Sequence, residues 1–99
     1  MEAFDPKQPY EAYYMDFDFV NDIVAPDEIS TATITVTDPD GADVTSILVS
    51  SVKQNIESPK VYFWIQAGTS GKTYTITCKI VTDNGEKYEM EGTIVVAEI

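Results

Sequence analysis

The chain has 99 residues, with 17 acidic side chains against six basic ones and a formal net charge of −11. This length suits one domain, in which a β-sandwich can close its core without metals or disulfides. The negative charge argues against nucleic acid as a partner, because binding it requires a basic face that replaces the phosphate counterions.

Residues 1–9 are polar, contain Pro6 and Pro9, and show no periodicity. They predict a flexible N-terminal arm that gains order only against another surface, followed by a single domain over residues 10–99. The arm lacks the features of a signal peptide, and no apolar stretch approaches the ~20 residues that a membrane span needs. We therefore expect a chain that is made in the cytosol, leaves it only inside an assembly, and does not insert into a membrane.

The first two strands are predicted from alternation of apolar and polar residues. Residues 11–20 form the first, with Glu11, Tyr13, Met15, Phe17 and Phe19 on its inner face. Residues 29–37 form the second, with Ala32, Ile34 and Val36 inside and threonines outside. The turn residues Asp38–Gly41 end this strand.

The middle of the chain is less regular. Residues 44–55 combine the apolar run Ile47–Val49 with polar residues, and we predict a strand there. Residues 60–66 form a further strand with Val61, Phe63 and Ile65 on one face and Tyr62 and Trp64 on the other. Since both faces are apolar, Trp64 is either a core tryptophan between two sheets or part of a surface that a partner covers.

Residues 61–96 hold two long alternating strands joined by Asp83-Asn84-Gly85. The Asn-Gly pair favours a type I′ hairpin, in which both central residues have positive φ. Tyr74 follows the glycine-containing segment Gly68–Lys72, a pattern similar to the tyrosine corner of immunoglobulin-like and fibronectin-type sandwiches, with Gly68 and Gly71 at the corner. Six or seven strands without helical periodicity predict an all-β, antiparallel sandwich of this type.

Residues that could carry chemistry are scarce. There is no histidine, and the lone Cys78 falls on an inward strand face, where it is expected to be a buried hydrophobe rather than a reactive thiol. Asp16 and Asp18 lie on one outward face about 7 Å apart, within the range of glycosidase carboxylate pairs, but a solvated strand face carries the same pattern.

Residues 38–43 contain three aspartates that could supply oxygen ligands to calcium. Their spacing departs from that of an EF-hand loop, because Gly41 directly follows the second aspartate. An ordinary acidic turn is the favoured interpretation. We therefore predict no enzymatic activity, no cofactor and no metal site.

Several blocks of the sequence together resemble one family. The blocks are Pro9–Glu11 through Asp16-Phe17, Glu28–Ala32 with Val36, Phe63–Ile65, Gly68–Tyr74, and Val81–Gly85 followed by Glu89 and Ile94–Val96. They resemble the small phage proteins called fiber-tail adaptors over nearly the whole chain. The chain departs from that family at Phe17 or Phe19, where a tryptophan is usual, at Ala67 in place of a second glycine, and at Glu86 in place of an arginine.

The resemblance implies a virion structural role without catalytic residues or cofactor. The expected partners are phage tail or neck proteins, or further copies of the chain in a ring. Tyr62 and Trp64 are the candidate contacts, together with the arm at residues 1–9. The alternative function from the sequence is a free-standing immunoglobulin-like adhesion or ligand-binding module.

Overall fold

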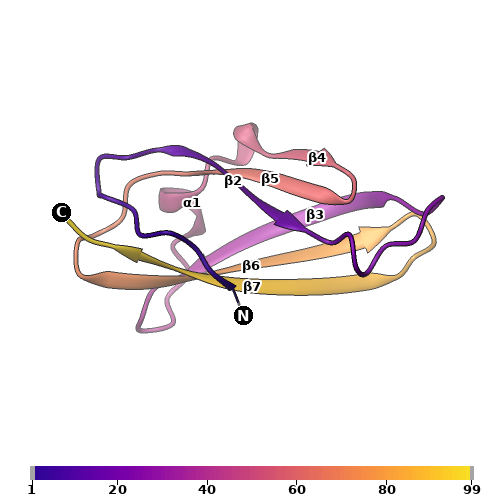
Figure 1. Ribbon diagram of the computed structural model, residues 1–99. Helices are drawn as coiled ribbons and strands as arrows, with labels where there is room; N and C mark the ends of the chain where they lie inside the picture. Colours follow the sequence, from indigo (N-terminus) through magenta and orange to yellow (C-terminus); the bar gives the residue numbers. More distant parts are fainter. Residues whose placement is uncertain (1, 99) are drawn as a thin grey trace.

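The computed structural model describes residues 2–98, which form two sheets packed face to face (Figure 1). One sheet has the order β1-β7-β6-β3 and comprises β1 (Glu2–Ala3), β7 (Lys87–Val96), β6 (Lys72–Thr82) and β3 (Ile29–Thr37). The other has the order β2-β5-β4 and comprises β2 (Tyr13–Asp18), β5 (Lys60–Ile65) and β4 (Asn55–Glu57). Apart from β1, which runs parallel to β7, all neighbouring strands are antiparallel. The predicted all-β sandwich is confirmed.

The core lies between the two sheets, where inward side chains of both layers meet. Its fully buried members include Phe17, Phe19, Val36, Val61, Phe63, Ile65, Ile76, Cys78, Ile94 and Val96. The Phe17 and Phe63 rings stack with centroids 5.5 Å apart, and so join β2 to β5. Glu11 is exposed and precedes β2, so the predicted inward face begins only at Tyr13.

Residues 44–55 do not form the predicted strand. They contain α1 (Thr45–Leu48), the 3-10 helix η1 (Ser51–Lys53) and the start of β4. Asp43 Oδ1 accepts hydrogen bonds from the Thr45 N–H (2.9 Å) and the Thr45 hydroxyl (2.6 Å) at the start of α1. Because this segment connects β3 in one sheet with β4 and β5 in the other, it bends across the side of the sandwich.

The hairpin between β6 and β7 is also not the predicted type I′ turn. Thr82 N–H donates to the Glu86 carbonyl (2.8 Å) and Gly85 N–H donates to the Thr82 carbonyl (2.9 Å). Within this loop only Gly85 has positive φ, at 84°. The loop therefore has three residues and ends in one left-handed glycine, a common alternative to the two-residue turn.

The N-terminal segment lies along the outer edge of β7. Phe4 N–H donates to the Thr93 carbonyl, Lys7 N–H to the Val95 carbonyl, and Ala97 N–H to the Lys7 carbonyl, each at 2.9 Å. The sequence assigned this segment to a flexible arm, and the division into arm and domain stays a prediction. Met1 lies outside the described residues.

Lys7 is fully buried, although its side chain carries an ammonium group. Its Nζ donates to the carbonyl oxygens of Gln8 (2.8 Å), Pro9 (3.4 Å) and Ala67. Burial lowers the pKa of Lys7, and the nearby Glu11 carboxylate opposes that shift. These bonds tie the N-terminal segment to the loop that leads into β6.

Candidate partner-binding surface

The outer face of the β2-β5-β4 sheet carries aromatic side chains. Along β5 the residues Val61, Phe63 and Ile65 are buried, whereas Tyr62 and Trp64 alternate with them and are only half-buried. Register places Tyr14 of β2 opposite Trp64, and Tyr14 is 54% exposed. Trp64 is therefore not the core tryptophan that the sequence left open, and it lies on an outward face.

Trp64 is held in place by two neighbours. The Tyr14 ring meets it edge to face, with centroids 5.0 Å apart and an interplanar angle of 79°. The Lys53 ammonium lies over the Trp64 ring, 3.9 Å from its centre. Such aromatic and cation–π contacts fix the orientation of the indole without burying it, so it presents a rigid apolar surface.

The corner before β6 has the geometry of a buried tyrosine that bonds to upstream backbone. Tyr74 is 3% exposed, and its hydroxyl accepts a hydrogen bond of 2.9 Å from the Thr69 N–H. Gly68 and Gly71 have φ of 100° and 90°. At Gly68 a Cβ atom would also lie 2.8 Å from Val96 Cγ2, so this position has both conformational and steric reasons to be glycine.

We expect Tyr74→Phe to lower the free energy of unfolding by about 1 kcal/mol, because the Thr69 N–H loses its acceptor while the ring keeps its place. Urea unfolding monitored by circular dichroism measures this. Tyr10→Phe is the matched control, since Tyr10 is 98% exposed and should show no change. A loss near zero for Tyr74→Phe would mean that its hydroxyl bond contributes nothing to the corner.

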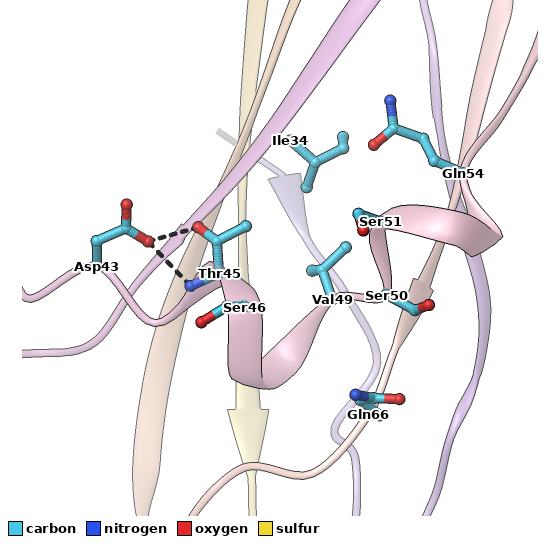
Figure 2. Close-up of a pocket in the computed structure, with 9 residues that line it drawn as sticks. All are labelled: Ile34, Asp43, Thr45, Ser46, Val49, Ser50, Ser51, Gln54 and Gln66. Carbon is cyan, nitrogen blue, oxygen red and sulfur yellow. Dashed lines mark hydrogen bonds between the residues drawn. The ribbon is translucent and has the colours of Figure 1, made fainter.

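A cleft of about 750 Å³ opens beside α1, between β3 and the β5 end (Figure 2). Its lining residues are Ile34, Asp43, Thr45, Ser46, Val49, Ser50, Ser51, Gln54 and Gln66. Hydrogen bonds from Thr45 hold the pKa of Asp43 below its ordinary value, so that carboxylate stays ionised and occupied. The lining offers hydroxyl and amide groups but no second acid or base near Asp43, and it supports polar contacts rather than acid–base chemistry.

The acidic turn at residues 38–43 uses its carboxylates on its own backbone. Asp38 Oδ1 accepts hydrogen bonds from the Asp40 and Ala42 N–H groups, both at 2.9 Å. Asp43 Oδ1 is engaged by Thr45 as described above. Within residues 2–98 there is no group of three or more His, Cys, Asp or Glu side chains placed to hold a metal ion.

The remaining candidates for chemistry are Asp16, Asp18 and Cys78. Asp18 Oδ1 accepts a hydrogen bond of 3.0 Å from the Val20 N–H, and Asp16 shares its outward face. Burial raises the pKa of Cys78 to about 12, so its thiol stays protonated and unreactive near neutral pH. In the described part of the chain no helix is long and apolar enough to cross a membrane.

Tyr62 and Trp64 were predicted from the sequence, whereas Tyr14 and Lys53 become parts of this surface only in the fold. Tyr14 alternates with the inward residues of the first predicted strand and so falls on its outer face, yet only the pairing of β2 with β5 brings it against Trp64. The sequence did not indicate that Lys53 contacts Trp64, because Lys53 falls in the segment that was predicted as a strand.

Residues 7–96 match the family described as podophage GP4 fiber-tail adaptor protein gp77. Among curated proteins, none matches the chain.

Proposed function

We propose that this chain, which belongs to the podophage fiber-tail adaptor family, is a non-catalytic structural component of a phage or prophage particle that links the tail or neck to fibers or to neighbouring tail proteins. In this proposal the chain works in the virion after synthesis in the host cytoplasm. It acts by being docked rather than by transforming a substrate.

The observation that carries the docking proposal is the aromatic outer face at Tyr14, Tyr62 and Trp64. Interfaces are enriched in aromatic residues, and a rigid tryptophan loses little conformational entropy when it is covered. Because the chain is strongly acidic, we expect a partner with a basic surface to dock faster than a neutral one. We also expect docking to weaken as the salt concentration is raised, since salt screens this attraction.

Trp64 is the single tryptophan of the chain and therefore reports on its own surface. We expect its fluorescence to be quenched by acrylamide in the free protein, and to become blue-shifted and protected when the protein assembles onto tail particles that lack it. The physical reason is that a partner would replace the water around the indole.

Two variants test whether this face carries docking. Tyr62→Ser should reduce incorporation into the particles at least about tenfold, since contacts at the centre of an interface carry most of its energy. Val24→Ser is the matched control, because Val24 is also exposed but belongs to the loop before β3. If Trp64 emission does not change on assembly and Tyr62→Ser is incorporated normally, this face is not part of the interface.

A further inference from the structure

The outer edge of β2 is an unpaired strand edge. Among residues 2–98, β2 ends its sheet and pairs with β5 alone. Phe19 N–H donates to the Pro59 carbonyl on the β5 side, and backbone groups in an antiparallel ladder alternate in direction. The N–H and C=O groups of Tyr14, Asp16 and Asp18 therefore point away from β5, and none has a hydrogen-bond partner among the described residues.

The other edges of the sandwich are covered or short. β1 pairs with the edge of β7. On β3 the Val36 backbone bonds to Val44 N–H and to the Thr45 hydroxyl, and the Ala32 carbonyl accepts from the Gln54 amide. β4 has only three residues. An unpaired edge on a six-residue strand such as β2 is unusual, because natural proteins protect the edges of their sheets from pairing with strands of other chains.

The surroundings of this edge are acidic. Asp16 and Asp18 lie on its outer face, and a hollow of about 210 Å³ beside it is lined by Phe4, Asp5, and residues 13–16. Burial, with the Glu11 and Asp5 carboxylates, raises the pKa of Tyr13 at the same edge. An added strand would therefore meet negative charge on its outer face and beside its backbone.

We propose that the β2 edge binds an extended basic segment of a neighbouring tail protein, which adds to the β2-β5-β4 sheet as a further strand. This inference rests on the proposed function and names the chemistry of the partner. Backbone bonds to Tyr14 and Asp16 supply the pairing, and lysines or arginines at alternate positions lie opposite Asp16 and Asp18.

Two copies of the chain, each with a net charge of −11, repel each other, and the register centred on Asp16 adds a local repulsion at this edge. In a two-fold antiparallel pairing centred on Asp16, the two Asp16 carboxylates would lie opposite each other, and Tyr14 would face Asp18. Like charges directly across a strand pair are destabilising. The same aspartates that discourage self-pairing thus select a basic strand, which is specificity by charge.

Amide hydrogen exchange tests the strand pairing directly in the unmodified protein. In the free chain the Asp16 amide should exchange much faster than the Met15 and Phe17 amides, which face β5. After assembly onto tail particles purified without this chain, the Asp16 amide should slow at least about tenfold. If the protein docks but the Asp16 amide still exchanges rapidly, the strand-pairing inference is wrong and the proposed function stands. If the protein does not dock at all, both the inference and the proposed function are wrong.

Charge reversal tests the basic partner. Asp16→Lys with Asp18→Lys should weaken docking at least about tenfold, because it places like charges across the new strand pair. Asp40→Lys with Asp83→Lys is the matched control, since both side chains are exposed in loops and the net charge changes equally. Circular dichroism establishes that both variants fold. If the variant with both Asp16 and Asp18 replaced docks as tightly as the unmodified protein, the partner segment is not basic.

Discussion

Lys7→Met should lower the free energy of unfolding by about 3 kcal/mol. The Lys7 ammonium is fully buried and donates to the carbonyls of Gln8, Pro9 and Ala67. Methionine has a similar length but no donor, so it would leave these acceptors without their partner inside the protein. Urea unfolding of the full chain measures the loss.

Lys87→Met makes the same chemical change on an exposed side chain and should alter the free energy of unfolding by less than about 0.5 kcal/mol. The two variants have the same net charge, so a difference between them reflects the buried contacts of Lys7. Equal stabilities would mean that water satisfies these carbonyls as well as Lys7 does, and that the N-terminal segment is not anchored there.

Regular alternation made most of the strands predictable. The buried faces of β3 and β5 fall on the residues expected, as does Cys78 in β6, because a strand with one inward face must alternate and a slip of one residue would turn Ile34 or Phe63 to solvent. The hairpin position was equally clear from Asn84-Gly85. Its turn type was not, since a three-residue loop with one left-handed glycine carries the same pair of residues.

Tertiary contacts decided what the sequence could not. The N-terminal segment has no periodicity, and its order comes from β7 and from the Ala67 carbonyl that Lys7 contacts, both of which are distant in sequence. Likewise Ile47–Val49 looks like a strand, but the chain crosses between the two sheets here, and Ile47 and Leu48 lie in α1. Local propensity is a weak guide where such contacts compete with it.

The candidate surface was predictable only in part. Alternation along β5 gave Tyr62 and Trp64 a common face, but a strand apolar on both faces does not reveal which face is the core. The choice follows from packing against the other sheet, because Val61, Phe63 and Ile65 belong to the buried core that the two sheets share. Register with β2 then brings Tyr14 to Trp64 and leaves the acidic edge open.

Gly92→Ala should lower the free energy of unfolding by about 2 kcal/mol, although alanine normally suits a strand better than glycine. A Cβ atom at Gly92 would lie 2.4 Å from Cε2 of Phe4. That ring packs edge to face on Phe17, with centroids 5.5 Å apart, so it cannot move aside without leaving its place on the core. The cost should appear in urea unfolding.

The double variant with Phe4→Ala separates this steric conflict from any other effect of the substitution. Phe4→Ala alone should cost about 2 kcal/mol of unfolding free energy, from lost packing on Phe17. In that background Gly92→Ala should cost nothing or stabilise slightly, because the ring that it would strike is absent and only the lower backbone entropy of alanine remains. Additive losses in the double variant would contradict this account, since they would mean that Gly92 is required for the β7 backbone itself and not for the seating of the N-terminal segment.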